Sequence, residues 1–468
     1  MKYLHGSPKP LIVWLTCFAF TLASILVCPP KGLALSIEQE TALGKKFLAN
    51  IKQHFALLDD PFAQEYIDEL GNALGKTVIV KPFPFHFYII KKNDLNAFAG
   101  PGGHIFVYSG LIGAMDNVDE LAGVLAHEMG HITARHLSQR IEQGEKIGLA
   151  TMAAVLAGIL IGGQVGAALT TGSVAAGIQT QLHYSREDER QADQLGFKYA
   201  TQAGFEPIGL LNALRIIQRH SWAQADRVPP YLLTHPTGPE RIANLESMIQ
   251  AYHPGIDTGK QAIKLRRLFP VFRTIVRAKC GDPDRMKEVF ETELHKGTHC
   301  SLAHLGLGIV YKARSEYLEA IRHLRLALEQ MPESVPICRE LGEAYQLKGD
   351  DRLALPLFER ILARRPDDRQ TMLLLAISYE NLEYYDRAIR LLKRLASYEK
   401  VSPNVFYHLG LCYGRLNKLA LAHYYFGTYF KRLRKYQKAR FHFREAKRLA
   451  TNDRSLQDRI DKASKAVP

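Results

Sequence analysis

The sequence predicts a mainly α-helical chain of the α+β class, in which helices and a small β-sheet are followed by an α-solenoid. Apolar residues recur at spacings of three and four through long stretches of the chain. Three short runs between residues 78 and 108 are rich in β-branched and aromatic side chains, and a 34-residue period begins at Ser301. At 468 residues the chain is too long for one compact core, so we expect at least two domains.

Residues 1–35 are typical of a secretory signal peptide. A basic start precedes the uncharged apolar run 11–27, and small residues follow with the spacing that signal peptidase recognises. We therefore expect an exported chain that is cleaved before Leu35. Two alternatives are an uncleaved membrane anchor, because the run is long, and a lipoprotein modified at Cys28.

The formal charge of +14 lies mostly at one end of the chain. Residues 401–468 contain 15 basic and 4 acidic side chains, a net charge of +11. These basic side chains have three interpretations: a solvated helix face, a surface that meets anionic lipid or lipopolysaccharide, or a surface that meets acidic proteins. Nucleic acid is not an expected partner of an exported chain.

Four cysteines follow the signal: Cys280, Cys300, Cys338 and Cys412. Their spacing fits no zinc site, and an exported chain can keep disulfides. Cys280 and Cys300 fall in neighbouring predicted helices and could pair. The alternative is a set of buried free thiols.

The first domain is expected to combine helices with a few strands. Residues 37–74 have the spacing of a helix, and residues 96–103 form a turn-rich link. A second helix is expected from about residue 116 to residue 139. Strands are expected at 78–80, 85–90 and 104–108.

The second of these helices contains His127-Glu128-Met129-Gly130-His131, an H-E-x-x-H pattern. Positions four apart lie on one face of a helix, so His127 and His131 can direct two imidazoles at one metal ion. Glu128 lies one residue further round, where a base for a metal-activated water is needed. The pattern predicts a zinc hydrolase site.

A zinc hydrolase needs a third protein ligand, and residues 185–193 offer several acids. A ligand carboxylate is best placed one turn from a second acid that holds a ligand histidine by its other ring nitrogen. Glu189 and Asp193 are four residues apart and fit this arrangement. We therefore expect Glu189 as the ligand and Asp193 as its supporting acid; the alternative is a solvated helix face of mixed charge.

Residues 147–179 are apolar, uncharged and rich in Ala and Gly. Their length allows one membrane span, but the glycines favour two helices or a flap near the active site with some lipid contact. The rest of this domain is expected to contain helices at 184–202, 208–223 and 242–249, a loop at 231–241 and a boundary at 254–255.

The 34-residue period repeats four times in one register. Position seven is Leu307, Leu341, Leu375 and Leu409. Position eleven is Tyr311, Tyr345, Tyr379 and Tyr413. Position twenty is Ala320, Ala354, Ala388 and Ala422. Small residues let paired helices approach closely, and this pattern is specific for helical hairpins of the tetratricopeptide type. Residues 263–297 are expected to form a degenerate hairpin before the repeats, and residues 439–446 indicate one more helix or hairpin after them.

These motifs resemble those of the zinc metallopeptidases of the HtpX and CAAX-prenyl-endopeptidase clan. The resemblance rests on the H-E-x-x-H pattern, residues 185–193, His235-Pro236 with Arg241, and residues 96–111. An exported member with C-terminal tetratricopeptide repeats resembles the bacterial periplasmic β-barrel assembly-enhancing proteases. The implied organisation is a signal peptide (1–35), a gluzincin-type zinc metallopeptidase domain (36–255) and a repeat domain (260–468).

The resemblance implies a role for each part of the site. One Zn²⁺ per chain is bound by His127, His131 and Glu189, with Glu128 as general base. His235 can occupy the fourth zinc position and keep the enzyme latent, and Arg241 either stabilises the oxyanion or braces the loop. A strand pairs with extended substrate through Gly103, His104, Ile105, Phe106 and Val107.

The implied function is an endopeptidase of the bacterial periplasm that acts in quality control and assembly of outer-membrane proteins. Its partners would be misfolded or assembling outer-membrane proteins and their assembly machinery. The alternative is a chaperone or scaffold whose repeats bind partners while the protease site stays mostly latent.

Overall fold

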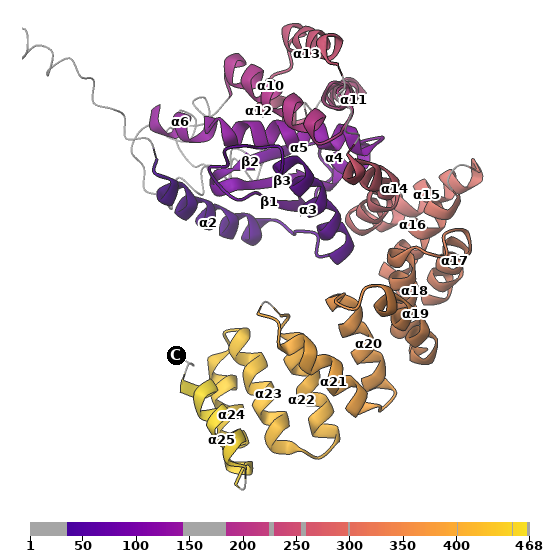
Figure 1. Cartoon of the computed structure of the whole chain (residues 1–468). Coiled ribbons are helices and arrows are strands. Elements are labelled where there is room, and N and C mark those ends of the chain that lie inside the picture. Colours follow the sequence, from indigo (N-terminus) through magenta and orange to yellow (C-terminus); the bar gives the residue numbers. More distant parts are fainter. Residues whose placement is uncertain are drawn as a thin grey trace, which may run out of the picture. The chain divides into compact units, whose positions relative to one another are not determined.

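The computed structural model describes residues 35–143, 184–223, 229–253, 259–297, 300–399, 401–451 and 453–465. The backbone packs into two compact units (Figure 1). The first comprises residues up to 57, 68–90 and 94–263, and the second comprises 58–67, 91–93 and 264 onwards. Three regions named from the sequence lie outside the described residues. They are residues 1–34 of the predicted signal peptide, the apolar segment 147–179 and the boundary at 254–255.

The first unit contains one three-stranded sheet. Its strands are β1 (His86–Ile90), β2 (Ala97–Gly100) and β3 (His104–Tyr108), in the order β1-β3-β2. β3 runs parallel to β1 and antiparallel to β2, so it is hydrogen-bonded on both sides.

Two sequence expectations for this region are wrong. Residues 78–80 form no strand, and Ile79 and Val80 are 88% and 77% exposed. The turn-rich link at 96–103 contains β2 and a 3-10 turn, η1 (Pro101–Gly103). Gly103 has φ +84° there, and a Cβ at this position would lie 2.2 Å from the carbonyl oxygen of Pro84. Only glycine fits that turn between two strands.

The predicted helix at 37–74 is two helices, α2 (Ile37–His54) and α3 (Pro61–Gly75). Ser36 caps α2 by accepting from the backbone N–H of Gln39, and Pro61 disfavours a helical conformation in the residue before it. α2 buries Phe47 against Phe98 and Phe106 of the sheet. This contact fixes α2 on the sheet.

The helix expected at 116–139 is also divided. α5 (Val118–Thr133) follows the short α4 (Ser109–Ala114) and is capped by Asn117, whose side chain accepts from the N–H of Glu120. Arg135 has φ +56° and separates α5 from α6 (His136–Gln143). The break turns the chain directly after the H-E-x-x-H pattern.

The remaining helices of the first unit are α10 (Arg186–Gln202), α11 (Gly209–Ala223), α12 (Pro230–Thr234) and α13 (Pro239–Ala251). α10 packs on α5 through glycines. A Cβ at Gly130 would lie 2.8 Å from the carbonyl oxygen of Ala192, and one at Gly196 would lie 2.8 Å from the Cα of His127. The two helices that carry the expected ligands therefore pack with their backbones close together.

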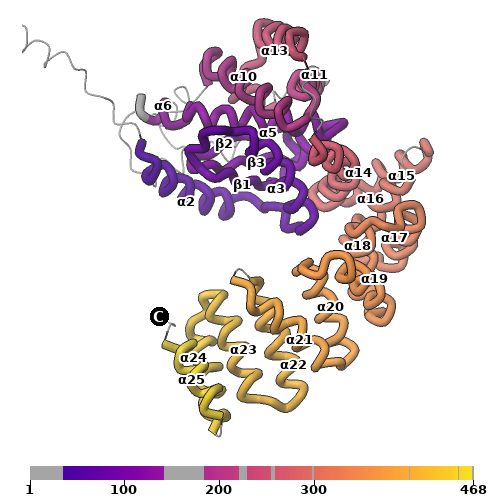
Figure 2. The backbone as a smooth tube through the Cα atoms, viewed as in Figure 1, coloured from indigo at the N-terminus to yellow at the C-terminus, as the bar shows by residue number. Residues whose placement is uncertain are grey.

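The second unit is a row of helices, and from the second helix of the row onwards each packs on the next, as the tube in Figure 2 shows. The helices are α14 (Lys260–Cys280), α15 (Pro283–His295), α16 (Cys300–Ala313), α17 (Tyr317–Gln330), α18 (Val335–Lys348), α19 (Asp351–Arg364), α20 (Arg369–Asn381), α21 (Tyr385–Ala396), α22 (Asn404–Arg415), α23 (Leu419–Arg432), α24 (Tyr436–Leu449) and α25 (Arg454–Lys465). The helices α16 to α23 follow the predicted 34-residue register, so the α-solenoid is confirmed.

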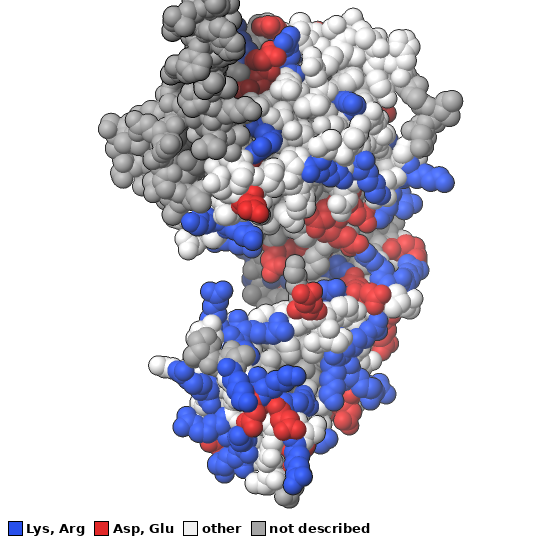
Figure 3. Space-filling view, turned by 60° about the vertical axis from the view of Figure 1, so that its left-hand side comes forward, with Lys and Arg blue, Asp and Glu red and all other residues white. Residues whose placement is uncertain are grey.

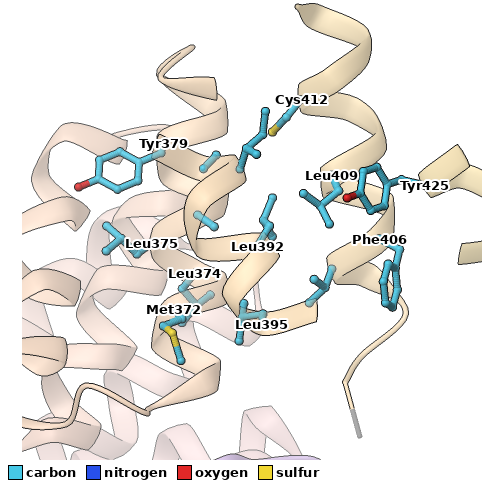
Figure 4. Close-up of a cluster of buried hydrophobic side chains, with 14 of the residues drawn as sticks. Met372, Leu374, Leu375, Tyr379, Leu392, Leu395, Phe406, Leu409, Cys412 and Tyr425 are labelled. Atoms are coloured by element: carbon cyan, nitrogen blue, oxygen red, sulfur yellow. The ribbon is translucent and has the colours of Figure 1, made fainter. Parts of the chain in front are cut away.

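The repeat positions form the core of this unit. Leu375 and Leu409 occupy position seven, and both are buried together with Leu392 between α20, α21 and α22 (Figure 4). Tyr379 and Tyr413 occupy position eleven and are largely buried. Helices are present at both places where further elements were expected: α14 and α15 before the repeats, and α24 with α25 packed on it after them.

Two further features bear on the sequence expectations. Within the described residues, Cys280 and Cys300 are half-buried and are not joined by a disulfide, whereas Cys338 and Cys412 are buried thiols. None of the helices in the described part of the chain is long and apolar enough to cross a membrane.

Candidate metal centre

The H-E-x-x-H pattern lies on the buried helix α5. His127 and Glu128 are fully buried, and His131 is 1% exposed. The ring nitrogens Nε2 of His127 and His131 are 3.0 Å apart. The helix therefore directs both imidazoles at one point, as the i, i+4 spacing predicts.

Two residues from other elements join this point. Glu189 of α10 places Oε1 3.4 Å from Nε2 of His131, and His235, which follows α12, places Nδ1 2.9 Å from the same oxygen. One donor atom from each of His127, His131, Glu189 and His235 lies within 4.8 Å of every other. Sequence reasoning named all four, and the fold brings them together.

The donor set fits a metal ion. Two ligand atoms that bind one zinc ion tetrahedrally at 2.0–2.1 Å are about 3.3 Å apart, and the separations between the donor atoms named here run from 2.9 to 3.4 Å. Glu128 adds a second observation. Both of its oxygens are buried without a hydrogen-bond partner among the described residues, and the nearest imidazole nitrogen, Nε2 of His235, is 3.5 Å from Oε1. Buried carboxylate oxygens without partners are costly unless a cation or water completes them.

Asp193 and Arg241 surround the cluster. Asp193 accepts from Nδ1 of His127 at 2.9 Å, which leaves Nε2 of that ring for the cluster. Arg241 donates to both oxygens of Asp193 at 2.7 and 2.8 Å, and its Nη1 lies 2.6 Å from Oε2 of Glu189. The predicted i, i+4 pair of acids is thus held by one guanidinium.

These contacts set the charges. Burial raises the pKa of Glu189 and of Asp193, but the neighbouring imidazoles and Arg241 outweigh it, so both pKa values lie below their usual ranges. Burial and Arg241 lower the pKa of His127, but its hydrogen bonds with Asp193 and Glu189 raise it to about 9. Burial keeps the pKa of His131 well below its usual value, so that ring is neutral.

Three residues that sequence reasoning missed contact the cluster, and a fourth contacts one of these three. Tyr184 stacks on His131 with ring centroids 3.9 Å apart, and Tyr231 stacks on His235 at 4.5 Å. His136 lies 3.0 Å from His131, and Gln191 lies 2.9 Å from His136. The only signal for His136 was a third histidine five residues after the pattern. Nothing in the sequence marked the two tyrosines.

The predicted substrate strand requires a correction. Gly103, His104, Ile105, Phe106 and Val107 were expected on an edge strand that pairs with extended substrate. His104 to Val107 lie on β3, which is the central strand, with its hydrogen bonds directed to β1 and β2. Gly103 lies in η1. Because both sides of β3 are occupied, substrate cannot add to it; the strand beside α5 with an outer edge is β2.

A cavity of about 720 Å³ lies beside the cluster. Its walls come from α10, from α13 and from the loop 236–238 that follows His235. Glu189, Asp193 and Arg241 form part of its lining. The loop that carries His235 therefore borders open space on one side.

Comparisons with known proteins agree with this geometry. Residues 61–249 match the model of peptidase family M48, and residues 337–370 match that of a tetratricopeptide repeat. The β-barrel assembly-enhancing protease of Yersinia pestis is 28% identical over 378 residues, which cover 80% of this chain and 76% of that protein.

Other relatives match a shorter part. The β-barrel assembly-enhancing protease of Escherichia coli strain K12 is 31% identical over 226 residues, 48% of this chain and 46% of that protein, so the match spans about half the length of this relative. Among solved structures, the tetratricopeptide-repeat protein YrrB is 18% identical and covers 43% of this chain and 96% of its own, with a TM-score of 0.30.

The first unit thus holds a buried cluster of His127, His131, Glu189 and His235 within the residues that the family model covers, and the second unit holds the helical repeats. Residues 61–249 match peptidase family M48, and together with the related β-barrel assembly-enhancing proteases this match indicates that the chain is a metalloprotease with tetratricopeptide repeats.

Proposed function

We propose that this chain is a zinc-dependent endopeptidase whose metal is held by His127, His131 and Glu189. The observation that carries the proposal is that one donor atom from each of these three residues and from His235 lies within 4.8 Å of the others. The helix α5, which supplies the two histidines, also carries Glu128. Two imidazoles and one carboxylate are the ligand set of a catalytic zinc site that keeps one position open.

Glu128 is the proposed general base. Zinc bound at this site would acidify a water molecule and polarise the scissile carbonyl. Glu128 is buried beside the cluster with no hydrogen-bond partner among the described residues, so its carboxylate can accept the proton of the attacking water. The same carboxyl group can then donate that proton to the leaving amine. Asp193 keeps His127 oriented, and Arg241 keeps both acids in place.

His235 is the proposed latch. Its Nδ1 lies 3.4 Å from Nε2 of His127 and 2.9 Å from Glu189, and its ring is fully buried. An imidazole in this position would take the place that water needs. His235 follows the short helix α12 and precedes Pro236, so a rearrangement of this loop would release it.

The same contacts favour a second function. A chain in which His235 stays in place would bind partners through its repeats while its protease site is closed. Repeat solenoids bind proteins on their faces without any catalytic group. The chain would then act as a chaperone or scaffold in the bacterial periplasm, the compartment proposed for the peptidase.

A casein-cleavage assay with zinc separates the two functions. We expect slow cleavage by the wild type, faster cleavage by His235→Ala, and none by Glu128→Gln, which keeps its zinc and its fold because the carboxylate is not a ligand. Glu187→Gln, on the exposed face of α10, is the control and should behave as the wild type. Cleavage of casein by a clean Glu128→Gln preparation would refute the mechanism. If neither the wild type nor His235→Ala cleaves casein, the result would favour the chaperone or scaffold function.

The substrates we propose are assembling or misassembled outer-membrane proteins of the bacterial periplasm. Support comes from the relatives named β-barrel assembly-enhancing proteases and from the repeats, which offer a surface for delivery. We further propose that β2, rather than β3, is the strand on which an extended substrate would align. Crosslinking with Glu128→Gln, which should retain substrate, identifies what is bound.

Anionic lipid or acidic protein is a further proposed partner of the C-terminal hairpins. Figure 3 shows Lys and Arg side chains gathered on the body that carries these repeats. Exposed basic residues of this region are Arg432, Arg434, Lys435, Lys438, Arg440, Arg444, Lys447 and Arg448. Residues 401–451 contain a single acidic side chain, Glu445, so this charge is largely uncompensated.

A further inference from the structure

His131 has a different partner at each ring nitrogen. Its Nε2 faces the cluster, 3.0 Å from Nε2 of His127 and 3.4 Å from Oε1 of Glu189. Its Nδ1 lies 3.0 Å from Nδ1 of a second buried imidazole, His136, at the start of α6. Two imidazole nitrogens at this distance share one proton, so one of them must donate and the other must accept.

The partners of Nε2 of His136 determine which of the two facing Nδ1 atoms donates the hydrogen bond. Nε2 of His136 lies 2.9 Å from Oε1 of Gln191 and 3.9 Å from Oδ1 of Asp188. Asp188 presents a carboxylate oxygen on this side, because Nε of Arg140 and the backbone N–H of Ser185 both donate to its other oxygen, Oδ2. Facing two acceptors, Nε2 of His136 carries the proton.

The direction of the remaining hydrogen bonds follows. In the tautomer of His136 that carries its proton on Nε2, Nδ1 has a lone pair and can only accept. His131 must then carry its proton on Nδ1 and keep the lone pair of Nε2 for the cluster. The ring cannot turn away, because Tyr184 stacks on its face with centroids 3.9 Å apart and an interplanar angle of 27°.

We propose that His136, oriented by Gln191 and Asp188, is a positioning residue that fixes His131 in the tautomer that binds metal through Nε2. This inference rests on the proposed metal site. His127 obtains the same orientation from the carboxylate of Asp193, 2.9 Å from its Nδ1. His136 does so for His131 without a carboxylate. A fourth carboxylate, beside Glu128, Glu189 and Asp193, would add negative charge to a buried site, and an imidazole avoids that.

The test uses two substitutions of nearly equal shape at position 136. His136→Leu removes the acceptor, whereas His136→Asn places an amide oxygen close to the position of Nδ1. On the full chain, zinc affinity is measured by competition with a chromophoric chelator. We expect His136→Leu to lower the affinity 10- to 100-fold, and His136→Asn to restore most of it.

Gln191 supplies a second test, because its side chain is exposed and its substitution leaves the core intact. Gln191→Leu should lower the zinc affinity several-fold and Gln191→Glu should not. Gln202→Leu, an exposed glutamine at the end of the same helix, is the matched control. The tautomer of His131 in the metal-free protein is read from long-range ¹H–¹⁵N spectra, with the signal assigned through His131→Gln.

The outcomes are distinct. Wild-type affinity in both His136→Leu and Gln191→Leu would overturn the proposal, as would a weakened His136→Leu in which His131 keeps its proton on Nδ1, since that result indicates packing alone. If His136→Leu fails to fold, Gln191→Leu and the tautomer of His131 decide. A wild-type chain that binds no zinc would instead overturn the proposed metal site.

Discussion

At the scale of single residues, the buried metal centre combines several carboxylates with one arginine. Three carboxylates, Glu128, Glu189 and Asp193, lie next to the cluster, and all three are at most 3% exposed. Arg241 is the only guanidinium that the structure places against Glu189 and Asp193 within the described residues. Because both acids pair with Arg241, we propose that its role is to brace this part of the site rather than to stabilise the oxyanion.

Asp193→Asn tests this arrangement. The amide still accepts from Nδ1 of His127 but loses the negative charge that makes the imidazole a stronger ligand. We expect zinc affinity to fall about tenfold or more, with the helix content unchanged. Chelator competition measures the affinity and far-ultraviolet circular dichroism the helix content. An affinity equal to that of the wild type would show that the charge of Asp193 is dispensable.

At the scale of elements, the close packing of α5 and α10 positions the ligands. Glu189 and His127 come from different helices, and their distance depends on how near the helix backbones lie. Gly130 and Gly196 permit that approach, since a Cβ at either position would lie within 2.8 Å of the partner helix. The distance between the proposed ligands on α5 and α10 therefore depends partly on two glycines that do not themselves bind the metal.

Gly196→Ala should push α10 away from α5. A methyl group against the backbone of His127 forces the helices apart, and we expect a loss of about 1–3 kcal/mol in the free energy of unfolding together with weaker zinc binding. Gly75→Ala is the control, because its Cβ would meet the side chains of Phe85 at 3.6 Å and Met129 at 3.9 Å, which are ordinary contacts. Denaturant unfolding of the two variants compares them; equal stability would contradict the packing argument.

The sequence identified helices and repeats better than helix ends and strands. α2 and α3 share one apolar periodicity, so only Pro61 marked the break between them. α5 ends at Thr133, and Arg135 two residues later has a φ of +56°, which is unusual for a residue with a side chain and is not encoded in any local pattern. β2 consists of Ala, Phe, Ala and Gly, residues of low strand propensity as a group, and it forms because β3 offers it hydrogen bonds.

At the scale of the molecule, the second unit contains a buried network of charges. Glu340 of α18 pairs with Lys279 of α14 at 2.7 Å and with Lys312 of α16 at 2.5 Å. Lys279 also pairs with Asp60, and Lys312 with Glu343. Burial raises the pKa of Glu340, but the two lysines outweigh it and lower the pKa to about 2.

Acid should remove this contribution. Because the pKa of Glu340 is lowered by folding, its ionised form stabilises the folded chain above about pH 4.5, and the contribution is lost as the pH falls from about 4.5 towards 2. The shift corresponds to roughly 3 kcal/mol. Denaturant unfolding of wild type and Glu340→Gln should differ by about that amount at pH 6, by roughly half as much near pH 3, and should converge only as the pH falls below about 2. A difference that does not change with pH would refute the role assigned to Glu340.

The sequence by itself determined the chemistry and the repeat architecture, because both depend on local spacing. Residues four apart share a helix face, so the sequence alone identified two pairs of site residues, His127 with His131 and Glu189 with Asp193. In the same way, a 34-residue period predicts stacked helical hairpins. Only the tertiary structure decided which strand is central, that Arg241 holds both acids, and that His136 meets His131 across a break between helices. Those relations join segments whose separation along the chain carries no periodic signal, and they depend on how helices and strands pack in space.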